Sequence, residues 1–382
     1  MARHYLDHAS TSPLRPEAAA AMRAWLELPA GDPGRVHHEG RVVRAAVETA
    51  REQVAALLGV RPRQVVFTSG ATEAANAAAW GATRDRPGAV VLCAPVEHSA
   101  VRHGSERLAP VEDLAVDAAG RIDPSSVSEA LARHRAAPPA LVQCQYANHE
   151  VGTLQPVDEV VALCRAAGVA VHVDAAAACG QVHLDLGALG ADLVSVSAHK
   201  LGGPPGVGAL VVGRGVRVAP LLVGGAQERA RRAGMENVPG IVGFGAAAEA
   251  LAADGGARLA AEQRSARART AALVAAATAA DGVSLLGDPD PGGRLPHVAC
   301  VSLEGVEAEP VLLGLDRAGV AAHSGSSCSS EVLEPSPVLA AMGADPDRSL
   351  RLSVGWSTVD EDVEAFSRAF PRVLEGLRSL RG

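Results

Sequence analysis

The sequence predicts an α/β fold with a largely parallel sheet, and three observations lead to that prediction. Short apolar runs alternate with helical segments from about residue 16 to residue 215. The runs are continuously apolar, which is typical of strands that a parallel sheet buries on both faces. Polar clusters follow several of the runs, and ligands bind outside the carboxyl ends of strands in such sheets.

The elements follow one another in a regular order. Residues 41–58 place Val43, Val47 and Val54 on one helical face, and Gly59 ends that helix. Apolar runs predict strands at 65–67, 89–93, 140–146, 169–173, 193–196 and 208–212. Helical segments separate most of them, at 72–82, 99–108, 125–135 and 157–167. Strands that alternate with helices in this way predict parallel neighbours.

The pattern changes after the glycine-rich stretch 222–245. Residues 246–280 form a long Ala- and Arg-rich helical pattern, which Asp254, Gly255 and Gly256 are expected to break. Strand-like pieces at 297–303 and 350–354 and helices near 308–319 and 359–380 follow. We therefore expect a large domain of residues 15–255 and a smaller α+β domain of residues 1–14 and 256–382.

Composition excludes several classes of protein. The 382 residues carry a formal net charge of −8 and only 2% aromatic residues, so we expect no nucleic-acid partner. The sequence begins with no apolar signal region, and no uncharged apolar stretch reaches the roughly 18 residues of a spanning helix. We therefore expect a cytoplasmic protein that does not bind a membrane. The six cysteines form no CxxC pair, which predicts neither a disulfide framework nor a metal site.

The chain contains a single lysine, Lys200, among 35 basic residues. Arginine can replace lysine as a surface charge or an ion-pair partner. It cannot replace a Schiff-base amine, because its guanidinium is never deprotonated in proteins. Lys200 follows the run 193–196 through Ser197 and His199, where a ligand site is expected. We interpret it as a functional amine, although one lysine could also survive by chance.

Three further groups at strand ends suit a cofactor held by such an amine. Asp174 could keep a pyridine nitrogen protonated, and His98 could stack on the ring and transfer protons near neutral pH. Residues 69–72 open a helix whose first N–H groups and dipole favour a phosphate. Each feature also has an ordinary interpretation, because Asp174 and Thr72 could be helix caps and His98 a surface histidine.

Eight segments resemble, in chain order, the cysteine desulfurases, which are pyridoxal 5'-phosphate (PLP) enzymes of the class V aminotransferase group. They are YLDHASTSPL, VVFTSGATEAAN, VEHSAV, NHEVGTLQPV, HVDAAAA, VSVSAHKLGGPPGVGAL, HSGSSCSS and RLSVGWST. SAHK followed by GGPPGVGAL is specific for the superfamily, and SGSSCSS followed by LEPS indicates the desulfurase branch. The resemblance implies a fold-type I PLP-dependent transferase. Its large domain has a mostly parallel seven-stranded sheet flanked by helices, and its smaller α+β C-terminal domain carries the Cys328 loop.

The resemblance also implies roles for individual residues. Lys200 would bind PLP as a Schiff base and act as the catalytic base, His98 would stack on the ring, and Asp174 would pair with its nitrogen. Arg351 and Asn148 match substrate-binding positions. The other implied cofactor-binding positions are Ala71, Thr72, His149, Ser197 and His199.

Cys328 matches the nucleophile that accepts sulfur. It lies among serines and a glycine, whereas the other five cysteines stand in apolar or helical contexts and are interpreted as packing groups. The implied activity converts L-cysteine to L-alanine and leaves a persulfide on the enzyme, which passes sulfur to an acceptor protein. The implied assembly is a homodimer with its sites at the subunit interface.

The sequence departs from the family pattern around the cofactor. His149 stands where a second Asn is usual, Ala177 where a Gln bonds the phenolate oxygen, and Met235 where a Thr of the neighbouring subunit caps the phosphate. Asp32 also replaces a usual Asn. We predict that His149 faces the phenolate oxygen and that Ala177 makes room for the imidazole.

Two alternatives stay open beside cysteine desulfurase. One is another class V PLP enzyme, such as a selenocysteine lyase or an aminotransferase-like enzyme, although Cys328 argues against transamination, which needs no thiol. The other is a catalytically weakened dimeric scaffold, against which the single lysine argues.

Overall fold

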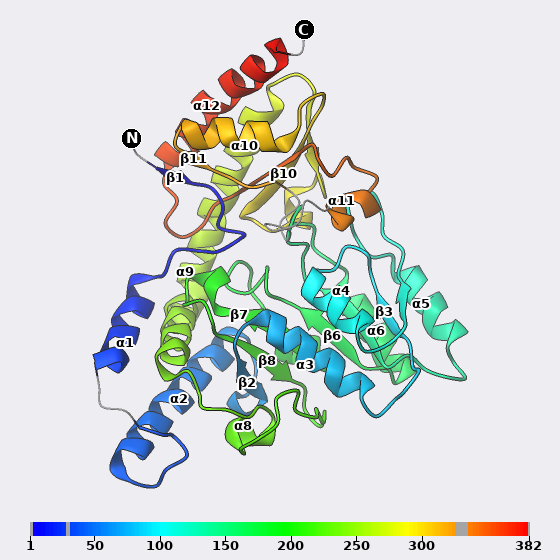
Figure 1. Ribbon diagram of the computed structural model, residues 1–382, viewed down its shortest axis with the longest axis vertical. Coiled ribbons are helices and arrows are strands. Elements are labelled where there is room, and N and C mark those ends of the chain that lie inside the picture. The colour runs from blue at the N-terminus through cyan, green and yellow to red at the C-terminus, as the bar shows by residue number, and fades with distance from the viewer. Residues whose placement is uncertain (1–2, 28–30, 325–334, 381–382) are drawn as a thin grey trace.

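The computed structural model describes residues 3–27, 31–324 and 335–380 (Figure 1). A large sheet with its helices forms the lower part of the molecule in Figure 1, and a smaller assembly of helices and strands lies above it. The helix α9 (Val238–Thr278) runs between the two parts. No helix of the described chain is long and apolar enough to span a membrane.

The large sheet has seven strands, and its polar strand ends face one cavity. In spatial order they are β2 (Val65–Thr68), β8 (Gly208–Val212), β7 (Leu193–Ser197), β6 (Val171–Asp174), β5 (Leu141–Gln145), β3 (Val91–Cys93) and β4 (Val111–Asp113). The neighbours of β8 run antiparallel to it, and the remaining neighbouring pairs are parallel. The prediction of a largely parallel sheet is confirmed. The short edge strand β4 lay outside the predicted runs because two of its three residues are acidic.

Helices cover this sheet and bury the predicted apolar faces. They are α1 (Pro16–Glu27), α2 (His38–Leu57), α3 (Ala71–Thr83), α4 (Ser99–Glu106), α5 (Pro124–Arg133), α6 (Val157–Ala167) and the short α7 (Leu186–Leu189) and α8 (Gln227–Ala230). Val43, Val47 and Val54 of α2 are buried in the main hydrophobic cluster, as their spacing predicted. The 3₁₀ turn η2 (Ala198–Leu201) follows β7 and carries Lys200.

The smaller assembly has its own hydrophobic cluster. The strands β12 (Ser349–Ser353), β10 (Val298–Leu303) and β9 (Val283–Leu286) form an antiparallel sheet, and β1 (His4–Tyr5) pairs with β11 (Val320–Ala321). The helices α10 (Ala308–Arg317) and α12 (Asp360–Ser379) complete this part, whereas α11 (Pro337–Ala341) buries Val338 and Leu339 in the main cluster of the large part. Within α9 the φ/ψ angles are non-helical from Ala253 to Gly256, where the sequence predicted a break. A domain boundary at residue 256 stays a prediction.

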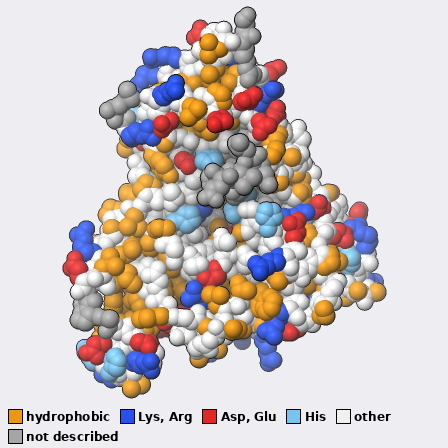
Figure 2. Space-filling model, in the orientation of Figure 1, with side chains coloured by type: hydrophobic (Ala, Val, Ile, Leu, Met, Phe, Trp, Pro, Cys, Tyr) orange, Lys and Arg blue, Asp and Glu red, His pale blue; other side chains and the backbone are white. Residues whose placement is uncertain are grey.

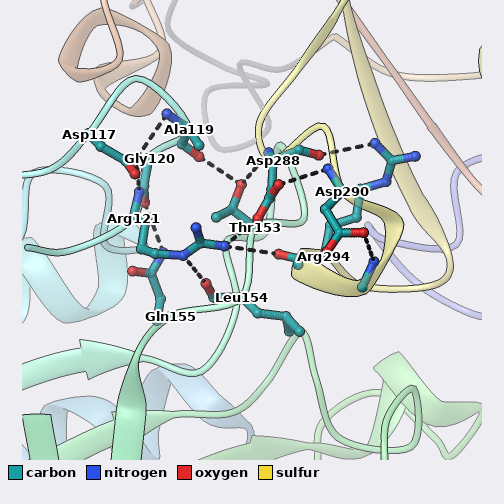
Figure 3. A network of polar contacts seen from close by, with 12 residues as sticks. Asp117, Ala119, Gly120, Arg121, Thr153, Leu154, Gln155, Asp288, Asp290 and Arg294 are labelled. Atoms are coloured by element: carbon teal, nitrogen blue, oxygen red, sulfur yellow. Dashed lines mark hydrogen bonds and ion pairs between the residues drawn. The ribbon is translucent and has the colours of Figure 1, made fainter. Parts of the chain in front are cut away.

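A polar network joins the two parts of the molecule (Figure 3). The Asp288 carboxylate, which precedes the 3₁₀ turn η3 (Pro291–Gly293), pairs with Arg121. Arg121 Nε donates to Leu154 O at 3.1 Å, and the Thr153 hydroxyl donates to Ala119 O at 2.7 Å while it accepts from Asp288 N at 3.1 Å. These bonds fix the segment after β5, which contains His149, against the smaller assembly.

We predict a large stability effect at the buried ion pair between Arg51 and Glu228. Both side chains are 3% exposed, and two bonds of 2.7 and 2.8 Å join them. Glu228 also takes a left-handed φ of 47°, a strained conformation that the pair holds in place. Arg51→Met would leave a buried carboxylate without its partner, so we expect the free energy of unfolding in a denaturant titration to fall by about 3–5 kcal/mol.

The control is Arg368→Met, because Arg368 and Glu364 form an ion pair that is 60% and 64% exposed. Exposed pairs contribute at most about 1 kcal/mol, so this variant should unfold close to the wild type. Equal stability of the two variants would contradict the prediction.

Candidate active site

A cavity of about 440 Å³ opens at the carboxyl ends of the parallel strands. Nine of the predicted site residues line it: Ala71, Thr72, His98, His149, Asp174, Ser197, His199, Lys200 and Arg351. Figure 2 shows histidine side chains around the hollow between the two parts of the molecule. The fold therefore brings together predicted site residues that are up to 280 positions apart in the sequence, from Ala71 to Arg351.

One end of the cavity suits a phosphate. Ala71 and Thr72 begin the 13-residue helix α3, whose first-turn N–H groups have no acceptor within the helix and whose dipole favours an anion. Gly208 permits the close approach of β8, because a Cβ there would lie 2.5 Å from Val196 O and 2.7 Å from the Gly70 Cα. Ser197, at the end of β7, lies on the same wall.

His199 adds a polar group to this end. Its Nδ1 lies 3.2 Å from the Thr11 hydroxyl. Burial, and to a lesser extent the charge of Lys200, lowers the pKa of His199 to about 4. A neutral imidazole can still donate one hydrogen bond to a phosphate oxygen.

Lys200 is part of η2 and lines the cavity. Its Nζ donates a hydrogen bond to Ala9 O, which also belongs to a lining residue. Asp174, at the end of β6, lines the same cavity. Its Oδ1 accepts from the Ser195 hydroxyl at 2.8 Å and from Ala176 N at 3.0 Å. These two bonds fix one carboxylate oxygen, and the carboxyl group remains part of the cavity lining.

Two histidine rings form another wall. His98 caps the N-terminus of α4, and its Nδ1 accepts from Ala100 N at 3.0 Å, which orients the ring. His149 meets it edge to face, with 4.9 Å between the ring centroids. His149 Nε2 lies 3.5 Å from Glu150 Oε1, and the other Glu150 oxygen accepts from the Ser336 hydroxyl at 2.6 Å. The small Ala177 also lines the cavity.

Glu97 lies behind this wall and was not among the predicted residues. Burial, and to a lesser extent the charge of Asp174, raises the pKa of Glu97 to about 8, although Gln145 N donates to its Oε1 at 2.6 Å. Near neutral pH this carboxyl is therefore mostly protonated. A neutral Glu97 adds no negative charge behind the two histidine rings.

Arg351 of β12 reaches the cavity from the smaller assembly. Its guanidinium pairs with Asp7 at 3.0 Å and donates to Ser10 Oγ at 2.6 Å and to His149 O at 3.1 Å. Its Nε is buried and has no hydrogen-bond partner among the described residues. A buried donor without a partner is costly, and a carboxylate in the cavity could satisfy it.

Asn148 and Met235, which the sequence also singled out, do not line this cavity. Asn148 is fully buried, and its amide is engaged by Val96 O and by the N–H groups of Glu150 and Val151, so it does not line the cavity. Met235 is 63% exposed and lies at a smaller neighbouring cavity with Ser69 and Gly206. Cys328 lies outside the described residues.

Ala9 and Ser10 line the cavity and were missed as individual residues. They belong to YLDHASTSPL, the first of the eight segments that resemble the cysteine desulfurases, so the resemblance could have indicated them. Their small side chains suggested no chemistry, and their contribution comes from where β1 places them.

The residues around the cavity fit PLP. The amine of Lys200, the carboxylate of Asp174, the ring of His98 and the helix N-terminus at Ala71 are the four groups that such a cofactor needs. The unpartnered Nε of Arg351 supplies a further place for an anionic substrate group. The fold and the cavity together are those of an α/β enzyme that binds PLP. Its lysine follows a strand end, and the phosphate site is the N-terminus of α3 in the same cavity.

The chain belongs to the aminotransferase class-V family, whose model matches residues 4–366. It is 36% identical to the cysteine desulfurase IscS of Dictyoglomus turgidum over 385 residues, which cover 98% of this chain and 95% of that protein. It is 40% identical to an IscS-like cysteine desulfurase of Mycobacterium tuberculosis over 380 residues, 96% of this chain and 95% of that protein. A solved NifS-like protein superposes with a TM-score of 0.88 at 28% identity and covers 98% of this chain and 100% of that one.

Proposed function

We propose that this protein is a PLP-dependent cysteine desulfurase that converts L-cysteine to L-alanine and passes the sulfur to a cysteine of its own. The observation that carries the proposal is the placement of the only lysine of the chain. Lys200 faces the same cavity as Asp174, the N-terminus of α3 and Arg351, whose buried Nε has no hydrogen-bond partner in the described part of the chain. The cysteine desulfurases among the similar proteins support this assignment.

PLP, when bound, forms a Schiff base with an amine and draws electrons away from the neighbouring carbon atom. Lys200 would hold the cofactor at rest, and its released Nζ would then take the proton from the substrate Cα. Arg351 would bind the α-carboxylate with its forked donors and so orient that Cα. Asp174 would keep the ring nitrogen protonated, while His98 would stack on the ring and move protons at its Nε2.

Cys328 would attack the substrate sulfur as a thiolate and keep it as a persulfide. The S–C bond of the substrate breaks, and the remaining three-carbon unit leaves as alanine after it takes up protons. The persulfide sulfur would then pass to an acceptor protein. We propose a homodimer in the cytoplasm as the working form, because the family resemblance implies sites at a subunit interface.

The test is a spectrum of the PLP-loaded protein before and after addition of L-cysteine, with alanine and sulfide measured in the presence of a thiol reductant. The proposal expects equal amounts of alanine and sulfide. Selenocysteine as the only productive substrate would support the lyase alternative. Amino transfer to a 2-oxo acid without sulfide would support the aminotransferase alternative, and a protein that binds PLP but converts nothing would support the scaffold.

We expect His149 to stabilise the ionised phenolate oxygen of PLP, as the usual Asn and Gln of the family do. A donor to that oxygen favours its ionised form and lowers the pKa of the protonated Schiff base. His149→Ala should therefore raise the pH midpoint of the visible band by about one unit, which corresponds to about 1.4 kcal/mol. The measurement is a spectral pH titration of the loaded protein.

The double variant His149→Asn with Ala177→Gln is the control, because it restores the usual pair of the family. It should return the midpoint toward the wild-type value. An unchanged midpoint in His149→Ala would show that the imidazole does not act on the phenolate.

A further inference from the structure

Four successive backbone carbonyls at the turn that carries Lys200 accept hydrogen bonds from residues outside the turn. His199 O accepts from Ser12 N at 3.0 Å, and Lys200 O accepts from Gln181 Nε2 at 2.9 Å. Leu201 O and Gly202 O both accept from one residue, Arg15, through its Nε at 2.7 Å and its N–H at 2.8 Å. Half of these external bonds therefore depend on Arg15.

Gly202 is shaped to receive Arg15. A Cβ at Gly202 would lie 2.6 Å from Arg15 Cγ and 3.0 Å from Nε, so a larger residue would displace the arginine. The φ of Gly202 is 86°, which also favours glycine. The turn and the arginine thus fit each other closely.

The other end of Arg15 is fixed by different parts of the chain. Its two terminal nitrogens bond both oxygens of Glu262 on α9, at 2.8 and 2.6 Å. Its guanidinium lies over the ring of Trp356, 5.5 Å from the centroid, and Trp356 Nε1 donates to Pro13 O. Arg15 is 2% exposed, so water cannot replace these partners. Its side chain is therefore held in a single position between α9, the residues after β12 and the lysine turn.

We propose that Arg15 is a positioning residue for Lys200, which rests on the proposed function that Lys200 binds PLP. Its Nε–H holds Leu201 O, so the turn keeps the Lys200 side chain directed into the cavity. Loss of that donor leaves a buried carbonyl unpaired, and the turn can relieve this only by moving. The Lys200 amine would then spend less time in the geometry that meets the PLP aldehyde.

A matched pair of variants isolates the donor. In Arg15→Gln the side-chain amide nitrogen stands as many bonds from the backbone as Arg15 Nε does, whereas Arg15→Met places a methyl group there. Both are made with Glu262→Gln, so that no buried carboxylate is left without its partner. The control is Arg258→Gln, because Arg258 also pairs with Glu262 but is 38% exposed, and its other ion pair is with Glu17 rather than with the turn.

The readouts are the rate at which added PLP forms the Schiff-base band with the PLP-free protein, the pH midpoint of that band, and the unfolding midpoint in denaturant. Both double variants carry Glu262→Gln. We expect the one with Arg15→Met to form the band about tenfold more slowly than the one with Arg15→Gln. We also expect the pH midpoint of the Met variant to differ from that of the Gln variant. Arg258→Gln should equal the wild type.

The outcomes separate the two proposals. Equal rates and equal pH midpoints in the Met and Gln variants would overturn the role of Arg15, even if both variants were less stable than the wild type. If the wild-type protein forms no band, the proposed function fails and the inference fails with it. If the Gln variant restores the rate but the Met variant does not, the positioning role is supported.

Discussion

Lys200→Arg is expected to abolish the covalent attachment of PLP and to lower alanine formation from L-cysteine by about 10⁴-fold or more. Arginine keeps the positive charge, but its guanidinium is not deprotonated and cannot form a Schiff base. No other lysine of the chain can take over, because the sequence has none. The measurements are the visible spectrum and the mass of the protein after borohydride reduction.

Arg351→Leu is the control for this experiment. Arg351 lines the same cavity but lies on β12, so its loss should keep the visible band and raise the KM for L-cysteine. A visible band in Lys200→Arg that survives dialysis, with the mass of the cofactor retained on the protein after borohydride reduction, would place the covalent linkage elsewhere and refute the proposed role of the lysine.

Cys328→Ser is expected to keep the visible band and its change with L-cysteine, but to lower sulfide release by about 10²-fold or more. Serine oxygen cannot hold a persulfide, whereas the binding of PLP uses other residues. The measurement is mass spectrometry for one added sulfur atom on the protein after exposure to L-cysteine. Equal sulfide release in the variant would remove Cys328 from the mechanism.

A buried cysteine gives the matched control. Burial raises the pKa of Cys179 to about 12, so its thiol is not ionised at neutral pH and cannot serve as a nucleophile. Cys179→Ala should therefore acquire the added sulfur atom as the wild type does.

The site could be predicted where its chemistry follows directly from a strand end. Asp174 and Lys200 could be recognised in this way, because a buried apolar run is followed at once by a group that packing does not require. The break in α9 was predictable for a similar reason, since two adjacent glycines after Asp254 disfavour a helix locally. In each case the signal lies within a few residues of the feature.

Tertiary contacts decided the features that the sequence did not predict. Arg15 looks like any surface arginine in the sequence, and only the folded chain shows that it is buried between Glu262 and the lysine turn. The raised pKa of Glu97 depends on burial beside Asp174, which is 77 residues away. Asn148 matched a binding position, but the turn that follows β5 uses its amide for its own backbone.

The place of β2 at the edge of the large sheet bears on the order in which the chain can fold during its synthesis. β2 is the first strand of that sheet to be made, and its neighbour in the sheet is β8, the last. About 140 residues separate the two strands, so at about 5–20 residues per second the ribosome needs roughly 7–30 s to supply the partner. The central parallel strands can pair before then, whereas β2 and the start of α3 have no sheet partner until β8 has been synthesised. The anion site at Ala71 is thus completed only after the lysine turn has been synthesised.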